Sequence, residues 1–254
     1  MVTTKETVIA SASQVSTSDW QPSIVRVVCG GLVGSLIGLA IYKGIYPIYT
    51  IPFEVSNVPS PVPAPALEKL EAYQYRVDCQ NYSIVFGLTG LAVGIVCALA
   101  ALKDQVKGVI FAGALGGILS GVGGMQAAMI VKTIRQTGAG DIVILGITFD
   151  SMTQSILAQA AIWGLMGLGV GAGIGIASGG TMAGIKIAIF GFVGGVFAAA
   201  AFIVLSAFAF PASSSSFVVP LAFMEQVIMM VIGGICIGGA IGVGLRKRAK
   251  IGSS

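Results

Sequence analysis

The chain has 254 residues, of which 56% are hydrophobic and 9% are charged, and its mean hydropathy is +0.95. Soluble domains carry about 25% charged residues, so this composition excludes a water-soluble globular protein. Histidine is absent, which excludes Ser-His-Asp hydrolysis, HExxH zinc chemistry and histidine proton relays. The net charge is only +4, and we predict membrane lipids rather than a nucleic acid as the partner of this surface.

The first 22 residues predict a polar N-terminal tail. Residues 1–22 are rich in Ser and Thr and have no apolar core after a basic start, so they do not resemble a signal peptide. Six segments of about 20 mainly apolar residues follow, each long enough to cross the hydrocarbon core of a bilayer. The predicted spans are 24–45, 82–102, 108–131, 156–178, 186–210 and 224–245. Residues 23–245 therefore predict an all-α integral membrane protein with a six-helix transmembrane domain.

Two longer connections are predicted on the external side. Residues 46–81 form a Pro-rich external loop, because Pro59, Pro61, Pro63 and Pro65 favour extended polyproline backbone. This loop is either a stiff spacer or a recognition ligand. Residues 132–155 form a second external loop with an apolar run between two aspartates that is too short to span. A short strand, a piece lying on the membrane surface and a re-entrant dip remain open for that run.

The distribution of cations predicts that both termini lie in the cytoplasm. Residues 246–254 form a basic cytoplasmic tail, with Arg246, Lys247, Arg248 and Lys250 as topology anchors. In this orientation, nine of the 14 Lys and Arg residues are inside: Lys5, Arg26, Lys103, Lys107, Lys186 and the four tail cations. An excess of Lys and Arg marks the cytoplasmic side of a membrane protein.

Many of the 37 glycines recur every four residues within the predicted spans. That spacing keeps them close to one face of a helix. Apolar side chains gain little by leaving lipid for a neighbouring helix, so helices in membranes associate by close packing of small residues. We therefore predict a close-packed bundle with glycine-zipper faces. The predicted helix-packing residues are Gly30, Gly34, Gly38, Gly90, Gly94, Gly113, Gly117, Gly121, Gly167, Gly171, Gly175, Gly179, Gly191, Gly195, Gly234, Gly238 and Gly242.

An internal repeat predicts a duplicated helical hairpin. Residues 87–94 read GLTGLAVG and residues 164–171 read GLMGLGVG. Downstream, KGVIFAGALGG from Lys107 matches KIAIFGFVGG from Lys186 with one gap. The second and third spans therefore correspond to the fourth and fifth.

The run GLGVGAGIGIASGG at 167–180 resembles the glycine-rich inner helix of rotary ATPase proteolipid subunits. Those proteins require a carboxylate in the middle of the membrane. The predicted spans here carry charge only near their ends, at Arg26, Lys43, Lys186 and Glu225, so the resemblance implies a shared packing style and no shared function. Gln126 is the predicted buried polar residue, because an amide in hydrocarbon needs a partner. With Asp141 and Asp150 it makes up the predicted polar site.

These observations predict a protein that is not an enzyme, with no catalytic, cofactor-binding or metal-binding residues. The first hypothesis is a structural or accessory subunit of a membrane complex, or a self-associating scaffold, whose partners are lipids and other membrane subunits or further copies of itself. The second is a channel or carrier for a small neutral solute, because transporters commonly place their sites at the junction of repeats.

Overall fold

The computed structural model describes residues 24–51, 64–102, 105–136, 142–144, 147–149, 151–210, 218–220 and 222–251. Its helices are α2 (Ile24–Ile45), α4 (Ala64–Ala101), α5 (Val106–Gln136), α6 (Ser151–Ala209) and α7 (Phe223–Ile251). The strands β1 (Ile142–Ile144) and β2 (Ile147–Phe149) form a small antiparallel hairpin between α5 and α6. The apolar run between Asp141 and Asp150 therefore contains two short strands.

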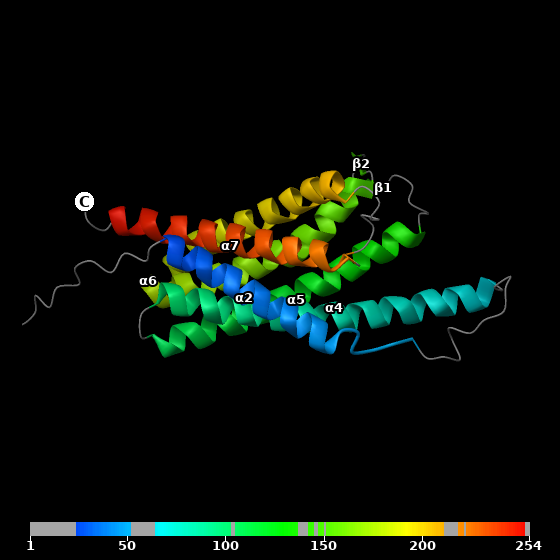
Figure 1. Ribbon diagram of the computed structural model, residues 1–254, viewed down its shortest axis with the longest axis horizontal. Helices are drawn as coiled ribbons and strands as arrows, with labels where there is room; N and C mark the ends of the chain where they lie inside the picture. Colours follow the sequence, from blue (N-terminus) through cyan, green and yellow to red (C-terminus); the bar gives the residue numbers. More distant parts are fainter. Residues whose placement is uncertain are drawn as a thin grey trace, which may run out of the picture.

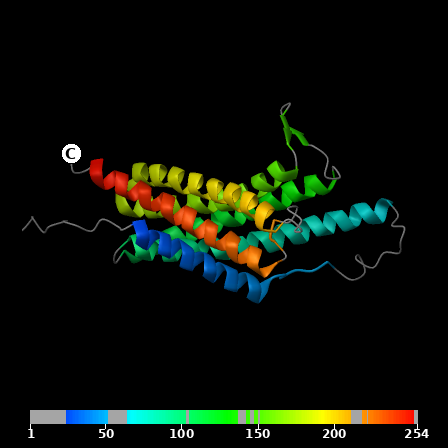
Figure 2. The same ribbon diagram turned by 45° about the horizontal axis from the view of Figure 1, so that its top comes forward.

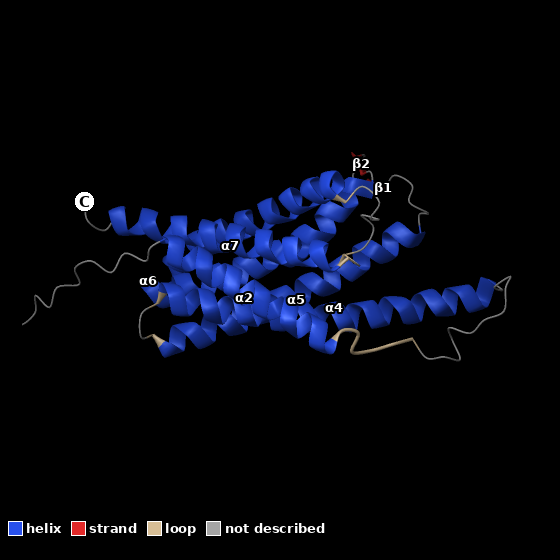
Figure 3. Cartoon of the chain, viewed as in Figure 1, coloured by secondary structure: helices blue, strands red, loops and turns tan. Residues whose placement is uncertain are grey.

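The five helices are all long and apolar enough to cross a membrane. They lie side by side along the long axis of the molecule (Figure 1). Helices that follow one another in the chain pack together, and α7 closes the arrangement by packing on α2. The same elements are coloured by type in Figure 3, where the helical character of the bundle is plain.

The two ends of the bundle differ in what they carry. The start of α2, the end of α4, the start of α5 and the last turns of α7 gather at one end, which we call the terminal end (Figures 1 and 2). The last turns of α2 and α5, the first and last turns of α6 and the start of α7 lie at the opposite end, which we call the loop end.

The helix α6 consists of two helical segments that meet at Gly179 and Gly180, where the backbone torsions are not helical. The segments run back along each other. A Cβ added to Gly175 would lie 2.6 Å from the carbonyl oxygen of Ala183. The predicted fourth and fifth spans lie on either side of this turn. The predicted spans leave residues 179–185 as their connection. In the structure only Gly179 and Gly180 are non-helical, and these two glycines reverse the chain.

We expect Gly180→Ala to destabilise the fold by about 1–2 kcal/mol, because its φ of 79° and ψ of −172° lie in a region that only glycine adopts readily. Gly44→Ala is the matched control: an added Cβ meets nothing within 4 Å at either position, but Gly44 is helical, where alanine is favoured. Unfolding in mixed micelles measures both. Equal effects would rule out backbone strain as the cause.

The interior of the bundle is filled by large side chains. Phe86, Trp163, Met166, Ile174 and Ile237 are all fully buried. The outward face is also apolar: Phe208 is 82% exposed and Phe197 is 65% exposed. A soluble protein does not surround itself with such a surface, so lipid must cover it.

Several helices extend beyond the predicted spans, because a hydropathy window detects the apolar stretch and not the end of the helix. The second helix begins at Ala64 and not at 82, so 64–81 of the predicted loop is helical. The third extends from Val106 to Gln136, and the sixth continues to Ile251 through most of the predicted basic tail. Residues such as Ala, Leu, Glu, Lys and Arg favour helix in water as well as in lipid.

Candidate functional site

The glycines of α2 lie on two faces, one against α4 and one against α7. A Cβ added to Gly34 would lie 2.6 Å from Cα of Val93 on α4. A Cβ added to Gly234 on α7 would lie 2.5 Å from the carbonyl oxygen of Gly31. Real Cβ atoms do not approach backbone closer than 3.0 Å, so these helix contacts require glycine.

The same close approach occurs between α4 and α5 and inside α6. A Cβ added to Gly116 would lie 2.6 Å from the carbonyl oxygen of Gly90. In α6, Gly167 and Gly191 face each other, and a Cβ on either would overlap the carbonyl group of the other. Such approaches bring Cα–H groups near facing carbonyls.

Sixteen of the seventeen predicted packing glycines have atoms of a neighbouring helical segment within 4 Å of an added Cβ: Gly30, Gly34, Gly38, Gly90, Gly94, Gly113, Gly117, Gly121, Gly167, Gly171, Gly175, Gly191, Gly195, Gly234, Gly238 and Gly242. The exception is Gly179, which lies in the turn of α6 and not on a helix face. Further glycines outside this set make the same kind of approach: Gly31, Gly116, Gly123, Gly169, Gly173 and Gly194.

The two hairpins of the predicted repeat pack in different registers. Gly90 meets Gly116 across the α4–α5 contact. The counterpart of Gly90 in the second copy is Gly167, and the counterpart of Gly116 is Gly194. Gly167 meets Gly191 instead, so the second hairpin is displaced by about one helical turn. The duplication itself stays a prediction.

A cluster of buried polar side chains joins α6 and α7 at the loop end. Gln159 donates from Nε2 to the carbonyl oxygen of Val218 and accepts a hydrogen bond of 3.0 Å from Nε1 of Trp163. Gln226 donates from Nε2 to the carbonyl oxygen of Pro220 at 2.6 Å. Val218 is 3% exposed. The segment 218–220 is therefore held inside the end of the bundle by side-chain amides.

Glu225 is a carboxylate almost completely enclosed by protein, with 2% of its surface exposed. Its Oε1 accepts a hydrogen bond of 2.9 Å from Oγ of Ser206. The residue lies in the first turn of α7. Glu225 thus ties α7 to the end of α6 at the loop end and is far from the middle of the bundle.

Asn81 is a second polar anchor at the loop end. Its Oδ1 accepts hydrogen bonds from the backbone N–H groups of Ile48 (3.1 Å) and Tyr49 (2.9 Å), and its Nδ2 donates to the carbonyl oxygen of Tyr49 at 2.9 Å. Backbone groups that leave a helix end need partners of this kind. Asn81 therefore fixes the chain that follows α2 against α4.

The predicted buried amide, Gln126, is exposed on the outer face of α5, so that prediction was wrong. The position of Gln126 relative to the nearby glycines already indicates that its side chain lies on the outer face. Gln126 is two positions from Gly124, which faces α4, and two positions correspond to about 200° around a helix. Gln159, Trp163 and Gly167 are spaced by four residues and therefore lie close to one face of α6. This spacing places Gln159 on the buried face.

The other predicted site residues are only partly described. Asp141 and Asp150 lie outside the described residues. Arg246 and Lys247 are exposed at the terminal end, and Lys247 Nζ lies 5.3 Å from the ring centroid of Phe190. Arg248 and Lys250 belong to α7, but the description does not extend to their side chains. Among the described residues, no three His, Cys, Asp or Glu side chains form a group that could hold a metal ion.

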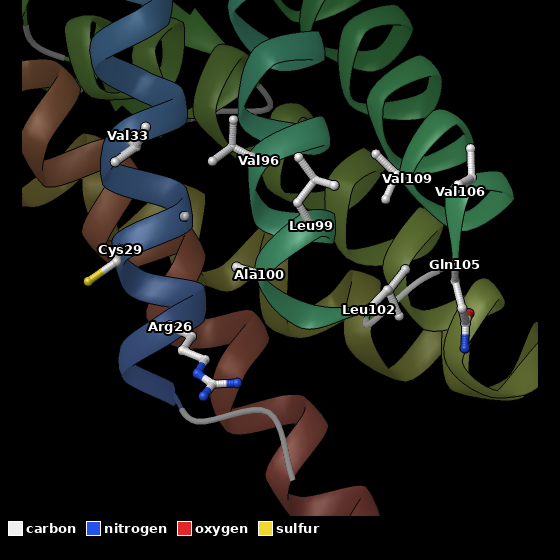
Figure 4. Close-up of a pocket in the computed structure, with 11 residues that line it drawn as sticks. Arg26, Cys29, Val33, Val96, Leu99, Ala100, Leu102, Gln105, Val106 and Val109 are labelled. Carbon is white, nitrogen blue, oxygen red and sulfur yellow. The ribbon is translucent and has the colours of Figure 1, made fainter. Parts of the chain in front are cut away.

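A groove of about 790 Å³ opens on the side of the bundle near the terminal end. Figure 4 shows its lining, with Arg26 at one rim and Gln105 at another. Most lining residues are apolar: Cys29, Gly30, Val33, Val96, Leu99, Ala100, Leu102, Val106 and Val109. The groove lies over the last turns of α4, between α2 and the start of α5.

The apolar surface and the long apolar helices define a multi-pass integral membrane protein. No known protein family, curated protein sequence or solved structure matches the chain.

Proposed function

We propose that the chain is a non-enzymatic structural or accessory subunit of a membrane complex, built as a close-packed bundle of six spans. Each of the two segments of the 59-residue α6 exceeds the roughly 20 residues needed to cross a bilayer, so the five helices supply six spans. The glycine contacts support close packing, because their backbone approach supplies the van der Waals contact that holds helices together in lipid.

The observation that carries the proposal is the helical arm formed by residues 64–74 of α4, before Tyr75 packs against the core. It projects beyond the loop end of the bundle in both views (Figures 1 and 2). Leu67 is 45% exposed on this arm, next to the exposed charges of Glu68 and Lys69. An isolated helix of this length is only marginally stable in water. Contact with another subunit would stabilise the arm and cover Leu67.

We expect a partner subunit or a second copy of the chain to remain bound after gentle solubilisation and to be detected by mass analysis. Leu67→Glu should reduce the recovered partner by about tenfold, because it places a charge in the contact. Ala72→Glu is the matched control, since Ala72 is also exposed on the arm but points about 140° away from Leu67. A monodisperse monomer without partners would contradict the proposal.

The proposed orientation places both termini and the terminal end in the cytoplasm. Arg26, Lys107, Lys186, Arg246 and Lys247 are exposed at that end, and an excess of cations favours the cytoplasmic side. In a background without native cysteines, Lys69→Cys should react with a membrane-impermeant maleimide on intact cells. Ser254→Cys should react only after the membrane is opened. The reverse pattern would overturn the orientation.

The second candidate is a channel or carrier for a small neutral solute, which the polar cluster at the loop end favours. Gln159 and Gln226 bind backbone carbonyls of the segment 218–220, and the same amides could bind a neutral solute if that segment withdrew. Flux of urea and glycerol into proteoliposomes distinguishes the two candidates. For a structural subunit we expect the two solutes to enter proteoliposomes no faster than protein-free liposomes. Faster entry that is abolished by Gln159→Leu would favour the carrier.

A further inference from the structure

The groove over the end of α4 lies beside the ends of three apolar helices, at the terminal end of the bundle. It is about 790 Å³ in volume, within the range of about 300–1,000 Å³ typical of small-molecule sites. Its floor and walls include Leu99, Val33 and Val106, which are 61%, 48% and 69% exposed. The small residues Gly30 and Ala100 bring α2 and α4 together and leave the surface hollow between these larger side chains.

The rim of the groove at the terminal end is positively charged. Arg26 lines the groove and is exposed. The carboxylates in the described part of the chain, Glu68, Glu71, Asp78 and Glu225, belong to the arm, the α4 turn that follows it and the loop end, which lie away from this rim. In the sequence, residues 103–107 contain two lysines, Lys103 and Lys107, and one aspartate, Asp104.

The start of α5 adds a second attraction for an anion. The first-turn hydrogen bond of this helix runs from the N–H of Val109 to the carbonyl oxygen of Gln105, at 3.1 Å. The preceding N–H groups of a helix have no partner within the helix, and its dipole favours negative charge at this end. Gln105 and Val106 both line the groove. A guanidinium and a helix N-terminus therefore border the same apolar hollow.

We propose that this groove binds an anionic phospholipid, with its phosphate at Arg26 and an acyl chain against Leu99 and Val33, while the start of α5 at the other rim adds to the attraction for the negative charge. Arginine binds phosphate through paired N–H donors. A soluble phosphate would not cover the apolar lining, whereas a lipid chain would. A lipid with a neutral choline headgroup would leave the cationic rim without a compensating net charge, so the anionic lipid is preferred.

The test is lipid binding by the full-length protein in mild detergent, followed by native mass spectrometry with phosphatidylglycerol or phosphatidylcholine. We expect the wild-type protein to prefer phosphatidylglycerol, and Arg26→Gln to reduce that preference about fivefold. Lys186→Gln is the matched control, since Lys186 is an exposed cation at the same end but does not line the groove. Equal affinities for the two lipids, or equal effects of the two variants, would overturn the proposal.

A second pair of variants tests the acyl-chain part of the site. Leu99→Trp should fill the groove and weaken both lipids, whereas Ile189→Trp, at an exposed position outside the groove, should weaken neither. Inorganic phosphate should not displace the lipid; displacement would mean that only the headgroup is held. A photo-reactive benzoylphenylalanine at position 99 should form an adduct with phospholipid in native membranes. An adduct with the chain's own N-terminal tail or with a second copy would assign the groove to that occupant and refute lipid binding.

Discussion

Replacing Gly167 with alanine is expected to lower the free energy of unfolding by about 3 kcal/mol. The two segments of α6 touch through Gly167 and Gly191, and a Cβ on Gly167 would overlap the carbonyl group of Gly191. Backbone atoms on both sides of the contact cannot move aside as a flexible side chain does. The segments would have to separate along their length, which removes contacts at neighbouring positions as well.

A series of Gly→Ala variants with graded contacts tests whether overlap of the added Cβ with facing backbone causes the loss of stability. At Gly113 an added Cβ meets the side chain of Ile95 at 2.7 Å, which can shift, so we expect a loss of about 1 kcal/mol. At Gly239 the nearest atom is Val28 Cγ2 at 3.7 Å, an ordinary contact. There the preference of a helix for alanine should leave stability unchanged or raise it by up to about 1 kcal/mol.

The measurement is unfolding in mixed micelles, with helix content as the signal. The double variant of Gly167 and Gly191 should lose less than the sum of the two single variants, because the first substitution already separates the segments. If all the variants were equally stable, the close approach would not be what holds this hairpin together.

The helical spans could be predicted from composition because lipid leaves the backbone few choices. A segment in hydrocarbon must satisfy its own hydrogen bonds, so an apolar run of sufficient length predicts a helix. The arm of α4 was not predicted as part of that helix, because its charged residues end the hydropathy signal before the helix ends. From Ala66 to Leu70 the sequence reads ALEKL, and these residues favour helix without any membrane.

The candidate site was less predictable because it depends on contacts between distant parts of the chain. Gln159 lies within the predicted span 156–178, but its partner at Val218 is 59 positions away. No local pattern places the segment 218–220 inside the bundle. The packing register of the two hairpins could not be predicted from the repeat either. Gly90 and Gly167 occupy matching positions in the sequence, but Gly90 contacts Gly116 and Gly167 contacts Gly191. The groove could not be predicted, because it is formed by the ends of three helices, α2, α4 and α5, that only the fold brings together.

Gln159→Leu is expected to destabilise the protein by about 2–4 kcal/mol, because it leaves two buried groups without hydrogen-bond partners. The Nε1–H of Trp163 and the carbonyl oxygen of Val218 both depend on the Gln159 amide. Trp163 is 1% exposed and Val218 is 3% exposed, so water cannot replace the lost partner without opening the loop end.

Gln126→Leu is the matched control, since it makes the same chemical change on the exposed face of α5. In lipid it should leave stability unchanged or raise it slightly. Unfolding in mixed micelles measures both variants, and a cysteine at Val218 reports on the segment 218–220. That thiol should react faster in the Gln159→Leu background and at the parental rate in the Gln126→Leu background. Equal stability and equal reactivity in the two backgrounds would show that the amide of Gln159 does not hold this segment in place.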